Sequence, residues 1–571
     1  MLSSNEKKEY QAIPIGIDSY KKMIDKSYYY VDKTLFIKEL LDKGGEVNLF
    51  TRPRRFGKTL ALSTIKCFFE KEIDWQGNVT DNSRYFQNTK IQKAGEKYIC
   101  HEQQYPVISL SLKSAKQPDF EMAYVSLLDE IQGEYKRHRY ILKSGALLED
   151  EREKYQKIMG GNAEAIDYAK SIEFLSKCLS AYHEKKTIIL IDEYDVPLEN
   201  AYFRGFYDKM IDFIRSLFES ALKTNDNLEF AVITGCLRIS RESIFTGLNN
   251  LKMNSITEEN CAEYFGFTPT EVEKMLEDFE VLYRLKEVKE WYDGYLFGNT
   301  EVYNPWSMLN YLVAAVENSK SLPKPYWSNT SSNSIVRTLI EGADDEVKEE
   351  LEILIQGGTI EKSIYEDITY EDVDKSQNNL WNFLFFTGYL TKVSENLVGN
   401  QIYAKLSIPN REIEYIYENT IRDWFRIHLE ATDLSQLYQA VLEGDCEKFA
   451  EEVTEQLLEC ISYNDYKEEF YHGFLCGLLK GCKGYRIASN RESGIGRYDI
   501  VMRYPSARGQ AMIMELKVAD TFDKLEAGCD KALAQIEEQK YDIDLRKDGY
   551  QNITKYGICF YKKECMVKRH S

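Results

Sequence analysis

The twelve cysteines and six histidines of this chain do not gather into metal-binding patterns. No C-x-x-C pair occurs, and the histidines stand apart from one another along the sequence. This scatter is typical of a reducing compartment and argues against structural zinc. The sequence also lacks any apolar run long enough to cross a bilayer, and its first residues, MLSSNEKKEY, lack the apolar core of a signal peptide. We therefore expect a cytoplasmic protein with no membrane partner.

Positive charge is scarce as well, because 93 Asp and Glu residues outnumber 73 Lys and Arg residues and leave a net charge of −20. A balance this acidic argues against a protein that wraps nucleic acid over a broad basic surface. The acidic balance is compatible with a local phosphate site, because sites that bind phosphates through metal ions carry carboxylates. A chain of 571 residues, 43% hydrophobic and 29% charged, is typical of a soluble globular protein. Its length predicts roughly three to four domains.

The stretch from Val47 to Phe68, VNLFTRPRRFGKTLALSTIKCF, predicts a phosphate-binding loop between a strand and a helix. In such loops backbone N–H groups meet the phosphates, a Lys neutralises their charge and a Thr hydroxyl ligates Mg²⁺. The usual pattern is G-x-x-x-x-G-K-[ST], and Arg52 stands in place of its first glycine. The alternative is a basic strand-to-helix turn without a ligand. The predicted nucleotide-contacting residues are Arg54, Arg55, Phe56, Gly57, Lys58 and Thr59, with Thr59 on the metal.

A second apolar stretch, TIILID, predicts a strand buried on both faces that ends in the acidic pair Asp192 and Glu193. In a P-loop protein the first carboxylate, Asp192, holds Mg²⁺ through water. The second, Glu193, orients or deprotonates the attacking water. The alternative is an acidic cap at the end of a strand. A further strand, FAVIT, ends at Thr234, a candidate sensor of the γ-phosphate, and Arg238 is a candidate for facing the phosphates, although an Arg in this position is often a surface residue.

Strands at about residues 47, 107, 188 and 230, separated by helical stretches, predict a mostly parallel sheet with the nucleotide at the C-terminal ends of the strands. From about residue 257 the pattern becomes mostly helical. A few strands are expected near residues 380–410, including a hairpin across Asn396 to Asn400. We interpret this part as a helical lid and connector.

The C-terminal part predicts a helix from about Asp465, strands at about 485–487, 499–502 and 511–518, another helix and a last strand near 555–561. This order places Asp499 and Glu515 on adjacent strands, where the two carboxylates and the Leu516 carbonyl offer oxygen ligands to Mg²⁺ or Mn²⁺. Glu469, or its neighbour Glu468, is a candidate for a further ligand.

Lys517 lies two residues beyond Glu515 and is expected on the same face of its strand. There it is placed to position or activate water, or to offset charge at a scissile phosphate. Gln535, on the following helix, is the accessory candidate. The alternative is an ordinary strand surface, on which E-x-K is very common.

Together these residues resemble the prokaryotic proteins that join an AAA-ATPase-like domain to a C-terminal PD-(D/E)xK nuclease-superfamily domain. The resemblance covers nearly the whole length, and the arginine-bearing loop RPRRFGKT looks like that family's own version. The ATPase part is also similar to the STAND-like P-loop ATPases, which often act as switches. In place of the Pro of a literal PD motif, Tyr498 precedes Asp499. The other motifs are IPIGIDSYKKM, YYYVDKT, LIDEYD, ESIFTGLNN, WYDGYLFG, VYNPWS, YWSNTSSN, YHGFLCGLL, GRYDIVM and MELKV.

The resemblance implies an α/β chain in three parts. These are a P-loop AAA-ATPase-like domain with a parallel sheet at 1–256, a mostly helical lid and connector at 257–455, and a restriction-endonuclease-like nuclease domain at 456–571. It implies Lys58 and Thr59 on phosphate and Mg²⁺, Asp192 and Glu193 as the acidic pair, and Asp499, Glu515, Lys517 and Gln535 at the nuclease site.

We therefore expect a protein that binds and hydrolyses ATP and whose nucleotide state gates Mg²⁺-dependent cleavage of nucleic acid, with DNA favoured over RNA and Mn²⁺ possible at the nuclease site. Defence and mobile-element handling both suit this arrangement, and so does a homo-oligomer. The first alternative is a regulatory ATPase switch whose C-terminal domain binds DNA or protein without cleavage. The second is an ATPase whose nuclease-like fold serves only for oligomerisation.

Overall fold

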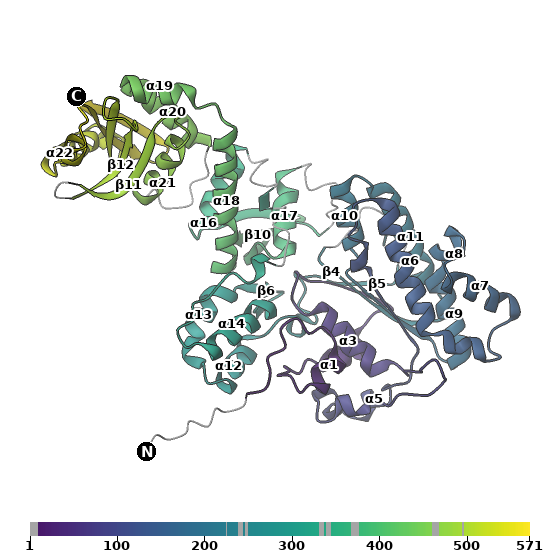
Figure 1. Cartoon of the computed structure of the whole chain (residues 1–571). Helices are drawn as coiled ribbons and strands as arrows, with labels where there is room; N and C mark the ends of the chain where they lie inside the picture. Colours follow the sequence, from purple (N-terminus) through teal and green to yellow (C-terminus); the bar gives the residue numbers. More distant parts are fainter. Residues whose placement is uncertain are drawn as a thin grey trace, which may run out of the picture. The chain divides into compact units, whose positions relative to one another are not determined.

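The computed structural model describes residues 10–223, 225–237, 244–245, 249–329, 336–337, 344–366, 376–459, 468–493 and 496–570. The chain divides into two compact units (Figure 1). The first comprises residues 1–332 and 361–414, and the second comprises residues 333–360 and 415–571.

The first unit is built on a parallel five-stranded sheet with the strand order β2-β3-β4-β1-β5. Strand β3 is buried along its whole length because it lies between two parallel neighbours, which explains its unbroken apolar sequence. The predicted parallel sheet is confirmed, and β5 adds a strand that the sequence analysis did not predict. The strands are β1 (Val47–Thr51), β2 (Val107–Ser111), β3 (Thr187–Asp192), β4 (Leu228–Gly235) and β5 (Leu251–Asn254).

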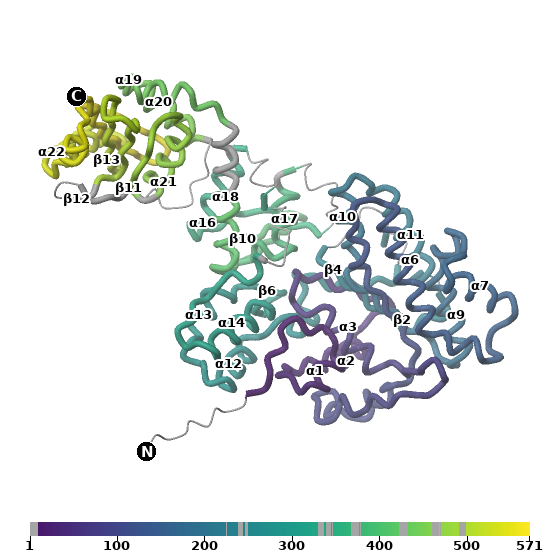
Figure 2. The backbone as a smooth tube through the Cα atoms, viewed as in Figure 1, coloured from purple at the N-terminus to yellow at the C-terminus, as the bar shows by residue number. Residues whose placement is uncertain are grey.

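Helices cover both faces of this sheet (Figures 1 and 2). On one face lies α3 (Lys58–Phe69) with α1 (Tyr20–Asp25) against it, and on the other lie α6 (Phe120–Arg137), α9 (Ser171–His183) and α11 (Tyr207–Leu222). The apolar residues of α11 recur every three or four positions, which gives it one continuous buried face. The other helices of this region are α2 (Leu35–Lys43), α4 (Lys90–Lys93), α5 (Glu96–Ile99), α7 (Glu149–Met159), α8 (Ala165–Ala169) and α10 (Val196–Arg204).

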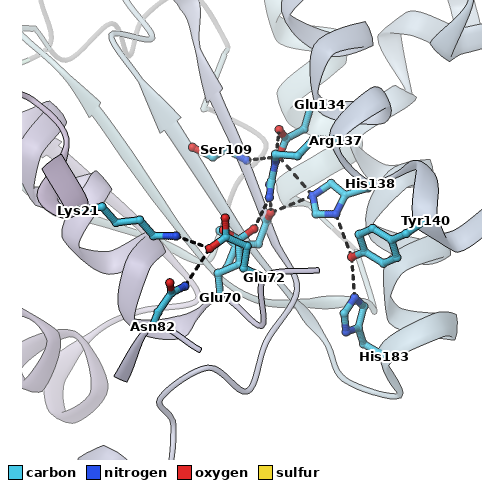
Figure 3. A network of polar contacts seen from close by, with 11 residues as sticks. Lys21, Glu70, Glu72, Asn82, Ser109, Glu134, Arg137, His138, Tyr140 and His183 are labelled. Carbon is cyan, nitrogen blue, oxygen red and sulfur yellow. Dashed lines mark hydrogen bonds and ion pairs between the residues drawn. The ribbon is translucent and has the colours of Figure 1, made fainter. Parts of the chain in front are cut away.

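A polar network fastens the C-terminal end of α3 to α6 (Figure 3). Arg137, in the last turn of α6, forms ion pairs with Glu70 and Glu134 and donates a hydrogen bond to the Val107 carbonyl. Because Val107 begins β2, this network lies at the N-terminal edge of the sheet, opposite the strand ends that carry the acidic pair. The network continues through His138, Tyr140 and His183.

The rest of the first unit consists of a group of helices and two small sheets. Strands β6 and β7 form a hairpin that the sequence analysis did not predict, whereas the hairpin of β9 and β10 confirms the one predicted across Asn396 to Asn400. The small sheets have the orders β6-β7 and β8-β10-β9. The elements are α12 (Pro269–Asp278), α13 (Leu285–Tyr292), β6 (Tyr295–Phe297), β7 (Thr300–Val302), α14 (Pro305–Glu317), β8 (Ile360–Ile364), α17 (Gln377–Thr387), β9 (Thr391–Val398) and β10 (Gln401–Ser407).

The second unit is an α/β domain around a sheet with the order β11-β12-β13-β14-β15, in which β13 and β14 are parallel and the other pairs antiparallel. The prediction of a last strand near 555–561 is wrong in one respect, because β15 follows and pairs with β14. The strands are β11 (Arg486–Ser493), β12 (Gly496–Arg503), β13 (Gln510–Val518), β14 (Asn552–Tyr561) and β15 (Glu564–His570).

Helices pack on both faces of this second sheet as well. Alternate residues of β13 face opposite ways: Met514 joins the core with α21, and Ile513 joins the core with α22. None of the described helices combines the length and apolar character that crossing a membrane requires. Helix α18 (Arg411–Ala431) leads from the first unit into the second, whose other helices are α16 (Asp345–Ile355), α19 (Ser435–Glu443), α20 (Cys446–Glu459), α21 (Glu468–Leu479), α22 (Leu525–Glu538) and α23 (Ile543–Lys547).

Candidate active sites

The phosphate loop lies between β1 and α3, and Gly57 immediately precedes the helix. Its φ of 86° is in the left-handed region, which a glycine adopts without strain. Lys58 is the first residue of α3, and its side chain is buried. Its Nζ donates to the carbonyl oxygens of Arg52 (3.0 Å) and Pro53 (3.1 Å) and lies 4.0 Å from Oε1 of Glu193. The ammonium group is thus held inside the loop and beside the acidic pair.

Arg52, which replaces the first glycine of the usual pattern, is fully buried. Its Nη1 donates to the carbonyls of Thr51 (2.8 Å) and Asn254 (2.7 Å), and its guanidinium carbon lies 5.1 Å from the ring centre of Phe265 and 5.2 Å from that of Phe297. Burial lowers the pKa of Arg52 to about 10. Arg52 is therefore a structural cross-link from β1 to the end of β5, and the charge of the loop surface comes from Arg54 and Arg55.

The acidic pair stands at the C-terminal end of β3. Asp192 accepts a hydrogen bond from the Thr59 hydroxyl through Oδ2 (2.6 Å) and one from Thr234 through Oδ1 (2.5 Å). Burial and the neighbouring carboxylate of Glu193 raise the pKa of Asp192. The fold thus brings together Lys58, Thr59, Asp192, Glu193 and Thr234, although they come from three different strand ends.

Tyr194 and Asp195, which follow the acidic pair, form hydrogen bonds with the backbone beyond β4. The sequence analysis did not predict either residue. Asp195 accepts hydrogen bonds from the backbone N–H groups of Cys236 (2.7 Å) and Leu237 (3.0 Å), and the Tyr194 hydroxyl donates to the Leu237 carbonyl (2.6 Å). Burial, with Glu193 nearby, raises the pKa of Asp195 to about 7. The motif D-E-Y-D, in which a third acidic residue follows the acidic pair, could have pointed to Asp195. The segment held in this way leads to the predicted Arg238, which lies outside the described residues.

A cavity of about 440 Å³ opens beside the phosphate loop. Gly57, Lys58, Thr59, Asp192 and Glu193 are among the polar residues that line it. Apolar residues from the N-terminal segment and from the chain after residue 262 also line the cavity. These include Ile17, Val31, Phe267, Met275, Trp306 and Leu309.

The other predicted loop residues also reach this cavity. Arg54 forms an ion pair with Glu199, and the Arg55 guanidinium lies 4.4 Å from the centre of the Trp306 ring. Phe56 is fully buried and packs edge-on against Tyr295. The cavity therefore offers charged and polar groups to phosphates and apolar side chains to a planar base.

The second constellation lies where β12 and β13 pair. Asp499 accepts a hydrogen bond from the backbone N–H of Leu516 through Oδ2 (2.8 Å). Lys517 Nζ lies 3.2 Å from Oε1 of Glu515 and donates to the Leu516 carbonyl (2.8 Å). The predicted grouping of Asp499, Glu515 and Lys517 is present, and the carbonyl expected as a metal ligand accepts a hydrogen bond from Lys517.

Among these three residues, Glu515 has the features expected of a metal ligand. Its side chain is buried, and its Oε2 has no hydrogen-bond partner among the described residues. Burial, with Asp499 as the next cause, raises the pKa of Glu515 to about 7. Two carboxylates held together with one oxygen unsatisfied fit a divalent cation, which prefers oxygen ligands. Among the described residues, no group of three or more His, Cys, Asp or Glu side chains gathers in this way.

Two further residues were predicted at this site, Gln535 and Glu469. Gln535, on α22, donates to the hydroxyl of Tyr541 (3.3 Å). Burial raises the pKa of that tyrosine, and the charges of Glu515, Asp499 and Lys517 have smaller effects on it. Glu469 belongs to α21, and its side chain is outside the described residues.

Sequence reasoning missed a histidine that contacts the Asp499 backbone. His472 Nε2 lies 3.0 Å from the Asp499 carbonyl oxygen, and His472 follows the predicted Glu469 by three residues on α21. That helical spacing was the signal that could have found it.

The first unit thus carries a phosphate-type loop and an acidic pair at the strand ends of a parallel sheet, and the second carries two carboxylates and a lysine where β12 pairs with β13. Residues 14–245 match the family described as "Predicted AAA-ATPase", and residues 466–570 match the PD-(D/E)XK nuclease superfamily. The chain therefore contains an AAA-ATPase-like domain and a PD-(D/E)XK nuclease-superfamily domain. It is also similar to the "Uncharacterized protein in vnfD 5'region" of Azotobacter chroococcum mcd 1, with 24% identity over 409 residues that cover 70% of this chain and 68% of the relative.

Proposed function

We propose that this protein binds and hydrolyses ATP, and that its nucleotide state gates metal-dependent cleavage of nucleic acid in the cytoplasm. The observation that carries the proposal is that one chain holds two separate constellations, each with carboxylates and a lysine placed for phosphate chemistry. The functional parts are 1–256 for the ATPase, 257–455 for a lid and connector, and 456–571 for the nuclease.

At the ATPase site the cavity accepts the phosphates at Gly57, Lys58 and Thr59 and the base among its apolar lining residues. Thr59 and Asp192 would hold Mg²⁺, which when bound neutralises charge on the β- and γ-phosphates. Glu193 orients the attacking water and accepts its proton. Thr234, hydrogen-bonded to Asp192, senses whether the γ-phosphate is present.

At the nuclease site Asp499 and Glu515 would hold Mg²⁺ or Mn²⁺, with Glu469 as a further ligand. When bound, the metal lowers the pKa of a water and stabilises charge at the scissile phosphate. Lys517 lies beside Glu515, where its ammonium positions that water or offsets charge on the phosphate. Gln535 and Tyr541 supply polar groups on the side of α22.

The test is cleavage of plasmid and single-stranded DNA with Mg²⁺ or Mn²⁺, with and without ATP. Wild type is compared with Asp499→Ala, Lys58→Ala and, as a control on an exposed turn of the second unit, Arg508→Ala. We expect Asp499→Ala to abolish cleavage and Lys58→Ala to remove its response to ATP. A folded wild type that binds ATP and cuts neither DNA nor RNA would contradict the nuclease half of the proposal.

The second candidate is a regulatory switch whose C-terminal domain binds DNA or protein without cutting. The net charge of −20 favours it, because a nuclease usually meets its substrate with a basic surface. An Mn²⁺ titration of heat stability separates the two. An ion that raises the melting temperature of wild type, but not that of Asp499→Ala, while no nucleic acid is cut supports the switch.

A further inference from the structure

Two lysines at the end of β2 face the same cavity as the phosphate loop. β2 pairs with β3 in parallel, and Ser111, its last residue, lies opposite Asp192. The short helix η2 (Leu112–Ala115) follows at once, so Lys113 and Lys116 emerge next to the acidic pair. Both lysines are exposed, and both line the cavity together with Ser111.

The other cations that line this cavity are already engaged. Lys58 is bound by loop carbonyls, and Lys33 forms an ion pair with Glu271. Arg54 is paired with Glu199, and Arg55 lies on the Trp306 ring. Within the described residues, Lys113 and Lys116 are the cavity-lining cations whose ammonium groups have no partner. Their charges are therefore available to a ligand.

We propose that Lys113 and Lys116 contact the γ-phosphate of ATP and supply in the same chain the positive charge that the transition state of hydrolysis requires. This assignment rests on the proposed ATPase function. The position fits because β3 separates β2 from β4 and β1, so a cation from β2 approaches the acidic pair from the side away from the phosphate loop. The nucleotide then lies between Lys58 on one side and these lysines on the other.

The reaction that these charges serve is hydrolysis of the terminal phosphoanhydride. A water oxygen forms a bond to the γ-phosphorus while the bond from phosphorus to the bridging oxygen breaks. The electron pair of that bond stays on the β-phosphate of ADP, and the proton of the water passes to Glu193. Ammonium groups held at the equatorial γ-oxygens stabilise the charge that is spread over them in the transition state.

The test uses the full chain with Lys113→Met, Lys116→Met and the double variant. Lys93→Met, at an exposed lysine of α4 outside the cavity, is the matched control. Because the lysines are exposed and without partners, their loss should leave the melting temperature near that of wild type. The measurements are the affinities for ATP and for ADP and the rate of hydrolysis.

We expect the double variant to bind ADP as wild type does, to lose about tenfold or more of its preference for ATP over ADP, and to hydrolyse ATP about 10²-fold more slowly. If the wild type binds ATP without hydrolysing it, the ratio of the affinities for ATP and ADP is by itself the test of the assignment. A double variant that matches Lys93→Met in both the ratio and the rate would overturn the assignment and leave the proposed ATPase function standing. A wild type that binds no ATP would overturn both.

Discussion

Arg52 occupies the position of a glycine in the usual phosphate loop and has become a buried cross-link. Its side chain donates hydrogen bonds to the carbonyl groups of Thr51 and Asn254 and contacts two phenylalanine rings. A loop that begins with a large buried side chain is positioned by the core beneath it, whereas a glycine leaves the loop to be shaped by its own backbone.

Restoring the glycine should therefore harm the protein. We expect Arg52→Gly to lower the free energy of unfolding of the first unit by about 2–4 kcal/mol, because it leaves a cavity and unpaired buried carbonyls. Urea unfolding followed by tryptophan fluorescence measures this. Arg55→Gly is the control: Arg55 is exposed with a φ of 70°, so a glycine there should cost much less. Equal losses in the two variants would contradict the cross-link.

Glu412 is a buried carboxyl with a direct consequence for stability. It accepts hydrogen bonds from the Ser307 hydroxyl (2.7 Å) and the Trp327 backbone N–H (2.8 Å), and burial raises its pKa to about 7. In the unfolded chain it ionises near its usual pKa, so the folded state loses stability as the pH rises from about 4.5 to 7.

Glu412→Gln keeps the shape of the side chain and cannot ionise. Relative to wild type, this variant should gain about 2–3 kcal/mol between pH 5 and pH 8, most of it before pH 7. Denaturant unfolding at a series of pH values measures the difference. The exposed Glu317→Gln is the control, and a difference that stays flat with pH in Glu412→Gln would refute the account.

At the scale of elements, the Glu70–Arg137–Glu134 network joins α3, which begins at the phosphate loop, to α6 at the far edge of the sheet (Figure 3). Arg137→Met leaves Glu70 and Glu134 buried without their partner. Since the arginine is partly exposed, we expect a loss of about 2–4 kcal/mol in unfolding free energy. Lys157→Met, which removes an exposed pair with Glu153, should change little. Similar effects in both variants would show that the network contributes no more than a surface pair.

The pairing of β12 with β13 brings Asp499 against Glu515 and leaves a buried oxygen of Glu515 unsatisfied. Glu515→Gln removes the repulsion between the carboxylates, so the metal-free variant should melt about 2–4 °C higher than wild type. The same change should remove any rise in melting temperature on adding Mn²⁺. Exposed Glu538→Gln on α22 is the control. A variant that melts lower than wild type and still responds to Mn²⁺ would contradict a metal role for Glu515.

At the scale of the molecule, the two units have separate cores and carry separate sites. Calorimetry should therefore resolve two unfolding transitions. ATP at about 100 times its Kd should stabilise one by about 2.7 kcal/mol, and Mn²⁺ should shift the other, because each ligand binds only one folded unit. Lys58→Ala should remove the first shift alone and Asp499→Ala the second alone. One transition that both ligands move equally would show that the units unfold together.

The strand-loop-helix of the phosphate site, the acidic pair at the end of β3, and the Asp499, Glu515 and Lys517 group could be predicted from the sequence. These are local patterns: the spacing of apolar residues and the residue types at strand ends decide them, and the side-chain period of a strand puts Glu515 and Lys517 on one face.

The tertiary structure alone decided the rest, because the remaining contacts join residues far apart in the chain. No local pattern shows that Arg52 lies under Asn254, that Asp195 holds the backbone beyond β4, or that His472 reaches the Asp499 carbonyl. The same holds for Lys113 and Lys116. Their sequence context is that of ordinary surface lysines, and only the pairing of β2 with β3 places them beside the acidic pair. Strand order is fixed by how the whole core packs, and only then do separate strand ends share one site.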